Sequence, residues 1–547
     1  MTIPIIFSAI VIFGCILGHR FSARVGVPAL LLFMALGMIF GSDGILKIPF
    51  DNYVLAEKIC TVSLLFIIFY GGFCTKWKTA KPVVVKAGLL ATIGVLLTAG
   101  LTSLFCYLVL NFSFIESFLA GAVISSTDAA SVFSILVSKK LNLKYGTAPL
   151  LEIESGSNDP VSFMLVIVGL SLINGDANAT DIVITIFTQI IFGALIGTFT
   201  AIIGGFVCKK NFIPDSMEDI FVIGLALFGF GMADYLNGNG YLSVYIMGII
   251  LGNLEIKNKI SLVHFFNGVT GLAQIIIFFL LGLLAFPSRL PSVFFSAISI
   301  AIFLIFIARP ISVFLVLKPF KATTKQCLLV SWAGLRGAAS IVFAIFIISG
   351  GGSESIHYDI FHIVFMISLI SVAVQGSLLP YVSKKLDMVD EKNDVRKTFN
   401  DYQEESSITL MKIFINKGHN WANKTISQIS LPTNSLALMI KRDGKTIIPK
   451  GDTMIYENDN VILSVPSYSE NNDEINLDEI KITKKHKWCG KYINELNLQD
   501  KTLIVMVKRG ESTIIPNGST TILKGDTVIV CHWWVVNRGL SIKTVGL

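Results

Sequence analysis

Residues 147–173 read TAPLLEIESGSNDPVSFMLVIVGLSLI, and this stretch indicates the class of the fold. It is long and apolar enough for one helix to cross roughly 30 Å of hydrocarbon. The letters ESGSNDP nevertheless place Glu154, Asn158 and Asp159 inside it. An ionisable side chain at the centre of a bilayer costs at least ~2.5–3.5 kcal/mol, so such residues normally face a cavity or a partner. We therefore expect a membrane helix that carries a polar site.

The composition of the whole chain supports the same class. Of its 547 residues, 53% are hydrophobic and 15% are charged, against about 25% charged in a soluble protein. Apolar runs recur as far as about residue 390, and short Ile, Val and Leu strands alternate with charged residues after it. We predict an all-α polytopic membrane domain at 1–385, a linker at 386–407, and an α+β tail of two small domains at 408–467 and 468–547.

About thirteen apolar stretches have the length that a membrane helix requires. We predict transmembrane helices at 1–19, 25–41, 52–73, 87–111, 115–138, 148–174, 182–207, 216–236, 240–253, 261–286, 292–317, 325–349 and 357–383. The first stretch lacks a basic start and a small-residue cleavage site, so we do not expect cleavage as a signal peptide. Basic residues concentrate in the loops after odd-numbered stretches, as at Lys76, Lys139 and Lys318. The positive-inside rule then predicts a multi-pass protein of the cell membrane with its N-terminus outside and its tail in the cytoplasm.

The charge and the cysteine content point to no other class of partner. The basic loops account for much of the net charge of +7, so we expect no nucleic-acid partner. The eight cysteines form no CxxC pair, and we expect reduced structural thiols. The seven histidines show no metal-ligand spacing.

The tail consists of two copies of one unit. Residues 439–463 read MIKRDGKTIIPKGDTMIYENDNVIL and residues 506–530 read MVKRGESTIIPNGSTTILKGDTVIV, which align without a gap. Trp421 also matches Trp488, so the copies cover roughly 408–467 and 475–533. Short β-branched strands alternate with turn signals, and LALMIKRDGKTIIPKGD predicts a hairpin. One helix in each unit is possible by the same pattern.

The repeated unit resembles the C-terminal subdomain of the RCK/TrkA regulatory modules. The resemblance implies that the subdomains pair and bind a small ligand, such as cyclic di-AMP or another nucleotide. No GxGxxG follows a strand in the tail, so the nucleotide-binding half of such modules is absent. A dimerisation or stability module without a ligand is the open alternative, and we expect no other cofactor.

Polar residues interrupt the stretch at 115–138, where FLAGAVISSTDAASVFSIL places Ser125, Ser126, Thr127 and Asp128 at its centre. Short polar side chains compete with the helix for backbone hydrogen bonds. A break here would expose carbonyl groups and the partial charges of two half-helix ends. An unbroken helix, in which the hydroxyl groups bond back to carbonyl groups one turn earlier, is the alternative.

The helix at 148–174 predicts an oxygen site. Glu152, Ser155 and Asp159 share one face at 3.6 residues per turn. Pro160 has no N–H group, so the carbonyl of Gly156 loses its usual partner one turn below Asp159. A carboxylate, a hydroxyl and a free carbonyl together suit a small monovalent cation or a proton. A buried, ion-paired structural cluster is the alternative.

A basic residue lies deep in the stretch at 325–349, where LLVSWAGLRGAASIVFAIF contains Arg336 between two glycines. An arginine keeps its charge and needs an acidic neighbour. We predict Glu154 as that neighbour and Asp128 as the next candidate. Arg309, in the sequence IARPIS, is predicted to be structural. If spans 1–6 and 8–13 form inverted repeats, the stretches at 115–138 and 325–349 are equivalent, and broken helices in equivalent positions indicate a transporter's midplane site.

These motifs resemble those of the monovalent cation/proton antiporters. STDAA, ESGSNDP and GLRGA occur in order, together with RVGVPALLLFMALGMIFG and YLSVYIMGIILGN, and the likeness covers nearly all of residues 1–385. The pair Asn158–Asp159 resembles the branch that carries Asn-Asp in the sixth span. The resemblance implies a homodimer whose ion-carrying bundle moves against a scaffold, and exchange of one cation for one proton.

The resemblance also implies a role for each polar residue. Asp159 binds either the cation or the proton, and Ser155 and the backbone at Thr127 complete the coordination, with Gly156 beside them. Asp128 lies where the broken helices cross. The residues that organise the site are implied to be Asn158 and Glu154, the latter acting through Arg336.

We therefore expect a secondary antiporter that exchanges a monovalent cation for protons by alternating access, is regulated by its tail, and serves pH homeostasis. The tail favours potassium over sodium by association only. A partly buried carboxylate that must hold either a proton or a metal ion couples the two fluxes by itself. An RCK-gated cation channel is one alternative, but the sequence contains no TVGYG-type selectivity filter. An intramembrane enzyme is another, but the sequence contains no HExxH or GxSxG motif. A transporter-like sensor that signals through its tail is the third alternative.

Overall fold

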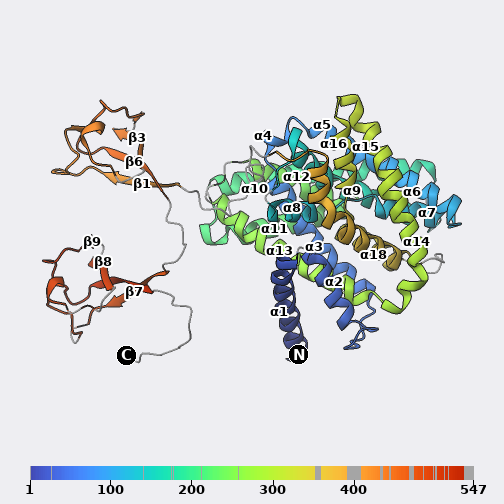
Figure 1. Ribbon diagram of the computed structural model, residues 1–547, viewed down its shortest axis with the longest axis horizontal. Coiled ribbons are helices and arrows are strands. Elements are labelled where there is room, and N and C mark those ends of the chain that lie inside the picture. The colour runs from blue at the N-terminus through green and yellow to red at the C-terminus, as the bar shows by residue number, and fades with distance from the viewer. Residues whose placement is uncertain are drawn as a thin grey trace. The chain divides into compact units, whose positions relative to one another are not determined.

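Helices and strands occupy separate parts of the chain (Figure 1). The computed structural model describes residues 2–25, 28–139, 141–173, 175, 178–210, 212–254, 256, 258–350, 359–390, 408–431, 435–442, 445–466, 474–483, 486–496, 498, 502–509, 512–514 and 516–534. The chain divides into two compact units, residues 1–403 and 404–547.

The first unit is a bundle of apolar helices. Its first half contains α1 (Thr2–Val25), α2 (Ala29–Phe40), α3 (Tyr53–Cys74), α4 (Trp77–Ala80), α5 (Val84–Leu89), α6 (Val95–Val109), α7 (Phe114–Ile124), α8 (Ala129–Ser138), α9 (Thr147–Ile173) and α10 (Ala179–Lys209). Its second half contains α11 (Glu218–Tyr235), α12 (Gly240–Asn253), α13 (Lys259–Leu284), α14 (Leu290–Phe303), α15 (Arg309–Leu317), α16 (Thr324–Trp332), α17 (Ala338–Ser349), α18 (Ile360–Ile370) and α19 (Ser377–Lys385).

Helical segments occupy each of the stretches that the sequence marked as apolar spans. Single π-helical turns at Leu90–Gly94, Leu304–Ala308 and Ser371–Gly376 join α5 to α6, α14 to α15 and α18 to α19. Among the described residues, 7 helices are long and apolar enough to cross a membrane. The first unit is thus a helical membrane domain.

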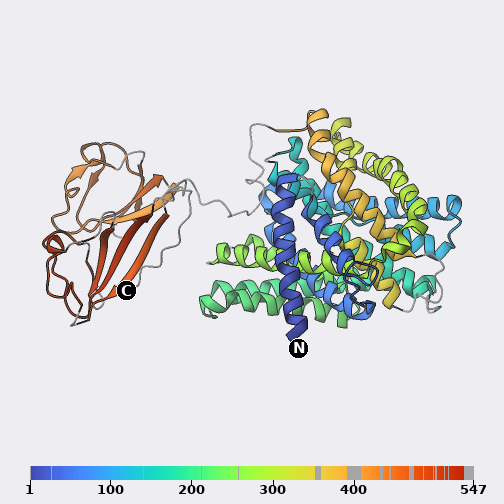
Figure 2. The same ribbon diagram turned by 60° about the horizontal axis from the view of Figure 1, so that its bottom comes forward.

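Glycines let pairs of helices approach closely. Gly37 of α2 lies against the backbone of Gly282 in α13, and Gly72 of α3 lies against the backbone of α12 near Tyr245. A side chain at these glycines would overlap the facing backbone, so the small residues permit the close packing that stabilises membrane helices. In contrast, α1 lies at the edge of the bundle (Figures 1 and 2) and exposes large apolar side chains such as Phe13 and Leu17.

The second unit contains two four-stranded sheets of the same topology, and β2 and β5 of the first copy form a further two-stranded sheet. The first copy has β1 (Ile408–Phe414), β2 (Lys424–Thr425), β3 (Leu436–Arg442), β4 (Lys445–Ile447), β5 (Met454–Ile455) and β6 (Asn460–Pro466). The second copy has β7 (Glu474–Lys481), β8 (Thr502–Arg509), β9 (Ser512–Ile514) and β10 (Thr527–Trp534). The four-stranded antiparallel sheets run in the orders β1-β6-β3-β4 and β7-β10-β8-β9, which confirms the repeat and the hairpin of β3 and β4.

The tail has less helix than we expected. Within its described residues, the helical segments are single 3-10 turns at Ile426–Gln428 and Ile493–Glu495. The α+β class predicted for the tail is therefore mainly β over the described ranges. The physical reason is visible in the sequence, because β-branched residues and frequent turn signals leave no apolar stretch long enough for a packed helix.

Each copy of the unit is fastened by the same ion pair. Arg442 donates two hydrogen bonds to the buried Asp459, at 2.8 Å and 2.7 Å. Arg509 donates two to the buried Asp526, both at 2.9 Å. Such forked pairs are among the stronger polar interactions in proteins, so the shared letters of the two copies carry a shared structural contact.

Candidate functional site

Two interrupted helices meet at the centre of the site. α7 ends at Ile124 and α8 begins at Ala129, while α16 ends at Trp332 and α17 begins at Ala338. The backbone N–H of Asp128 donates to the carbonyl of Leu335 at 2.8 Å, which joins the two interruptions. Gly337 lies so close to the Asp128 carboxylate that a Cβ atom there would overlap it. The alternative of an unbroken helix at 115–138 is thereby excluded.

Local hydrogen bonds explain why α8 starts where it does. The carboxylate of Asp128 accepts from the backbone N–H of Ser131 at 3.2 Å and from its hydroxyl at 2.5 Å. This is the arrangement of an N-cap, which satisfies a free N–H group of the first turn. A negative charge at this end also complements the partial positive charge of the helix terminus.

Arg336 lies at the opposite kind of terminus. Its Nη1 donates to the carbonyls of Ser125 and Ser126, at 2.8 Å and 2.6 Å, just beyond the C-terminal end of α7. The last carbonyls of a helix lack intrahelical partners, and a cation there complements the partial negative charge of the terminus. Arg336 is 1% exposed, so these carbonyls are its environment.

The predicted pairing of Arg336 with Glu154 is wrong. Glu154 forms its ion pair with Arg309 of α15, and these side chains are 1% and 2% exposed. Nη1 of Arg336 is bonded instead by free carbonyls of the interrupted helix, and such carbonyls are available only where a helix breaks inside the bundle. Arg309, which we predicted to be structural, is thus the ion-pair partner of Glu154.

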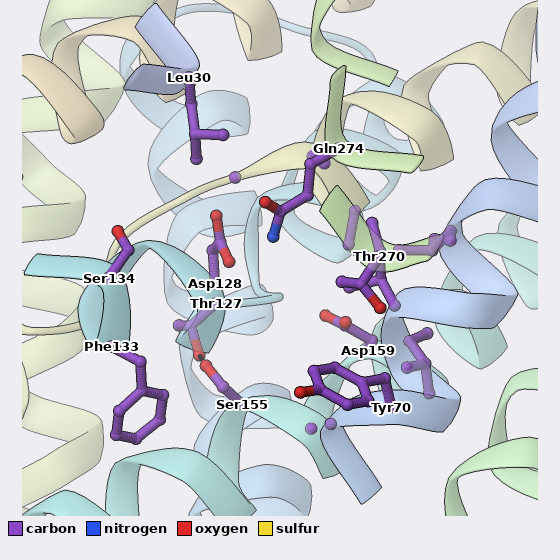
Figure 3. A pocket seen from close by; sticks show the side chains of 18 of the residues that line it. Leu30, Tyr70, Thr127, Asp128, Phe133, Ser134, Ser155, Asp159, Thr270 and Gln274 are labelled. Carbon is purple, nitrogen blue, oxygen red and sulfur yellow. Dashed lines mark hydrogen bonds between the residues drawn. The ribbon is translucent and has the colours of Figure 1, made fainter. Parts of the chain in front are cut away.

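The interruption after α7 is bonded directly to α9. The hydroxyl of Ser126 donates to Oδ1 of Asp159. Asn158 Nδ2 donates to the Thr127 hydroxyl at 2.5 Å, and its Oδ1 accepts from the Thr127 backbone N–H at 3.4 Å. The hydroxyl groups of Thr127 and Ser155 lie 2.7 Å apart, side by side in Figure 3. The structure therefore brings together Thr127, Ser155, Asn158 and Asp159, as the sequence predicts.

These groups border a cavity of about 370 Å³. Asp128 and Asp159 lie on two sides of it (Figure 3), and Glu152 and Ser155 line it as well. Glu152 accepts a hydrogen bond from the hydroxyl of Thr75 at 3.2 Å. The lining thus combines carboxylates and hydroxyl oxygens, which are the ligands that hard cations prefer.

Gly156 borders the same cavity, at a point where the ring of Tyr245 approaches the helix. A Cβ atom at position 156 would overlap that ring, so glycine permits the contact. α9 continues as one helix through Pro160, whose carbonyl accepts from Asn239 Nδ2 at 2.8 Å. That hydrogen bond anchors the polar turn of α9 to the start of α12.

The facing wall of the cavity was not predicted from the sequence. Asn267, Thr270 and Gln274 line it from α13, and Figure 3 shows Thr270 and Gln274 opposite the two aspartates. Thr270 is 8% exposed, and its hydroxyl has no hydrogen-bond partner among the described residues. The signal was present in the sequence, because the three polar residues recur at helical spacing in FNGVTGLAQ. Ser126 was also missed as a contact of Asp159, although it belongs to the polar run.

Comparison with known proteins matches both units. The model of the family described as sodium/hydrogen exchanger, transmembrane, matches residues 8–385. The chain belongs to the sodium/hydrogen exchanger family. The TrkA-C domain matches residues 410–468 and 477–531, one match for each copy of the repeat. The family resemblance of the membrane motifs and of the tail is thus confirmed.

Individual members of the exchanger family are similar over most of the chain. The K(+)/H(+) antiporter NhaP of Alkalimonas amylolytica is 32% identical over 447 residues, which cover 81% of this chain and 77% of that protein. The K(+)/H(+) antiporter NhaP2 of Shewanella sp. (strain MR-4) is 29% identical over 518 residues, covering 93% and 77%.

A solved exchanger structure has the same fold. The sodium proton antiporter MjNhaP1 of Methanocaldococcus jannaschii superimposes with a TM-score of 0.60 at 25% identity, covering 71% of this chain and 98% of MjNhaP1. The membrane unit of this protein therefore has the fold of a sodium/hydrogen exchanger.

Proposed function

We propose that the protein exchanges potassium ions for protons across the cell membrane by alternating access. The observation that carries the proposal is the position of Asp159, a buried carboxylate at the border of the cavity that accepts a hydrogen bond from Ser126. A carboxylate in such surroundings is costly when it is charged and empty. It holds a proton or a cation, and each displaces the other.

The bound cation is proposed to contact oxygen atoms from both interrupted and continuous helices. Asp159 supplies charge, Ser155 and Thr127 supply hydroxyl or backbone oxygens, and the Gly156 carbonyl completes the set. Asn158 positions Thr127 through two hydrogen bonds. The hydroxyl of Thr270, which has no hydrogen-bond partner among the residues that the structure describes, borders the same space, and we propose that it bonds to the water molecules around the entering ion.

Two further groups shape the electrostatics. Asp128 caps α8 beside the crossing, and Arg336 lies at the carbonyl end of α7. The partial charges of the interrupted helices are therefore compensated even when no ion is present. Movement of a neutralised Asp159 then meets no large barrier from uncompensated charge.

Potassium is the proposed ion because it is the ion named in the relatives that are similar over most of the chain, including the tail. Sodium is the second candidate, because the structurally similar MjNhaP1 is named a sodium proton antiporter. The pair Asn158–Asp159 supports exchange of one cation for one proton, without net charge.

The arrangement in the cell follows from the sequence and the family. We propose thirteen transmembrane helices that include two inverted repeats, an external N-terminus and a cytoplasmic tail. We also propose a homodimer and a role in pH homeostasis, and the limits 1–385, 386–407, 408–467 and 468–547 for the domains and linker. The TrkA-C units are proposed to regulate exchange, with cyclic di-AMP or another nucleotide as the candidate ligand.

Proton flux from reconstituted vesicles tests the proposal. Vesicles that contain the full-length protein and a pH-sensitive dye receive a potassium, sodium or choline gradient. We expect proton movement opposite to potassium, a weaker response to sodium and none to choline, and Asp159→Asn to abolish it in a folded protein. Potassium movement without opposite proton movement would instead indicate a channel, and no flux in folded protein would indicate a sensor.

A further inference from the structure

The residues that follow α19 pack against another loop of the membrane unit. After α19, residues 386–390 lie against residues 142–144, in the loop between α8 and α9. Leu143 and Val389 form an antiparallel β-bridge. The Lys144 N–H donates to the Met388 carbonyl at 2.9 Å, and the Asp390 N–H donates to the Asn142 carbonyl at 2.8 Å. We call residues 386–390 the strap.

Side chains fasten the strap at two further points. Lys144 Nζ donates to Asp387 Oδ1 at 2.8 Å and to the Asp387 carbonyl at 3.0 Å. Lys325 of α16 lies 3.8 Å from the other oxygen of Asp387. The hydrogen bond from Lys144, with the charge of Lys325, holds the pKa of Asp387 below its ordinary value. Met388 is 1% exposed and packs in the same apolar cluster as Leu143.

The strap contacts the elements that build the ion site. The loop at 141–147 joins α8, which begins beside Asp128, to α9, which carries Asp159. Thr147, at the start of α9, accepts a hydrogen bond at 3.2 Å from Gln326 of α16, the first half of the other interrupted helix. The strap thus contacts the loop that joins one interrupted helix to α9, and Lys325 of the other interrupted helix.

We propose that the strap transmits the state of the regulatory tail to the cation site. The tail changes exchange by loosening or tightening residues 386–390 on the loop between α8 and α9. This inference rests on the proposed exchange function and names the route of its regulation. Coupling between distant sites requires an element that can take two discrete arrangements, and the strap, bound or released, is the element that we assign to this role.

A reversible disulfide between the strap and the loop tests whether the strap transmits the effect of the tail. Leu143 and Val389 face each other without hydrogen bonds between them, since those bonds join the flanking residues. Opposed residues of this kind have Cα atoms about 4.5 Å apart, which suits a disulfide. Leu143→Cys with Val389→Cys thus locks the strap under oxidation and frees it under reduction. Each single-cysteine variant is the control for effects of oxidation on the native cysteines.

The tail is perturbed in the same protein by Arg442→Gln, which removes the ion-pair partner of the buried Asp459. We expect this variant to change the apparent KM for potassium by about fivefold or more in the reduced, full-length protein, a size typical of coupling between sites. After oxidation of the double-cysteine protein, the same variant should change KM by less than about twofold. Lys441→Gln, a neighbouring exposed lysine, controls for the lost charge.

Two results would contradict the proposed role of the strap. An equal effect of Arg442→Gln in the locked and free proteins means that the tail acts by another route. No effect of Arg442→Gln on exchange in either state, with the tail shown to be perturbed by hydrogen exchange, means that the tail does not act on the site. Failure of the proposed function is a different result, because potassium-driven proton flux is then absent from the unmodified protein.

Discussion

Glu154 is paired with Arg309 in the buried part of the membrane unit, whereas Arg336 donates to the carbonyls at the end of α7. The two arginines therefore have different partners, although both are buried positive charges near the interrupted helices. Arg309 neutralises an acidic side chain of α9. Arg336 neutralises the end of an interrupted helix.

Removal of one member of the buried pair should destabilise the protein strongly. Arg309→Gln removes the ion-pair partner of the buried Glu154, and breaking a buried pair costs about 3–5 kcal/mol. Arg309→Gln combined with Glu154→Gln should recover most of this loss. Thermal unfolding of the purified protein in detergent measures it. The control is a second double-mutant cycle, with Arg336→Gln and Glu154→Gln, in which the two losses of stability should be close to additive. A larger coupling free energy for Arg336 with Glu154 than for Arg309 with Glu154 would contradict the assignment of Arg309 as the partner of Glu154.

Ser126→Ala should weaken cation binding. Its hydroxyl donates to the Asp159 carboxylate and so stabilises the charged form that binds the cation. Loss of a hydrogen bond to a charged group costs about 1.5–3 kcal/mol, and we expect the apparent KM for potassium to rise about tenfold at constant pH. Ser134→Ala is the control, because it removes a hydroxyl of the same cavity that donates to the Ser131 carbonyl. An unchanged KM for Ser126→Ala would remove Ser126 from the site.

Thr270→Val should distinguish a functional wall of the cavity from a structural one. Valine keeps the shape of threonine and removes the unpaired hydroxyl. We expect a several-fold higher KM for potassium with little change in thermal stability, because no intramolecular hydrogen bond is lost. Thr102 of α6 is the matched control, since its hydroxyl is also buried and unpaired among the described residues but lies outside the cavity lining. Equal effects of Thr102→Val and Thr270→Val on KM would contradict the assignment.

The repeated ion pairs should make the tail sensitive to acid. Burial opposes the shift, but hydrogen bonds from Arg442 and from the Tyr456 backbone hold the pKa of Asp459 below its ordinary value. For Asp526 the hydrogen bond from Arg509 is the main cause of a lowered pKa. A folded-state pKa below the unfolded value, near 4, gives stability that is complete above the unfolded value and is lost as pH falls through the folded value.

Hydrogen exchange of the full-length protein measures this dependence. At pH 7, Arg442→Gln should increase exchange in β3 and β6 about tenfold or more, which corresponds to the loss of a charged hydrogen bond. Lys441→Gln should leave it unchanged. Once the pH falls below the lowered folded-state pKa of Asp459, the unmodified protein and Arg442→Gln should converge, because protonated Asp459 no longer gains from the arginine. A constant difference across that range would show that Arg442 acts by packing alone.

The helical stretches and the repeat were predictable because each rests on a local pattern. Apolar length marks membrane helices, and the letters KR, TIIP and D-x-V-I place corresponding residues of the two sheets at corresponding positions. The meeting of Thr127 and Ser155 with Asn158 was also predictable, because polar side chains in apolar helices gather where they satisfy one another.

The partner of Glu154 was not predictable from local pattern. The sequence offers two buried arginines, and the choice between them depends on which helix faces α9. It also depends on the free carbonyls of Ser125 and Ser126, which exist only because α7 stops at Ile124. The wall formed by Thr270 and Gln274 depends in the same way on which face of α13 lines the cavity. The partner of Glu154 and the cavity-lining face of α13 are both set by packing between helices, which a local sequence pattern does not contain.

The central claim is that Asp159 holds a proton or a cation, and never both. Proton release on cation binding tests it most directly. The cation-free protein in weakly buffered detergent solution, at a pH where titration shows the site protonated, receives potassium chloride or choline chloride. The account predicts release of close to one proton per protein molecule with potassium, none with choline, and none from folded Asp159→Asn. Potassium binding without proton release, or release that persists in Asp159→Asn, would contradict it.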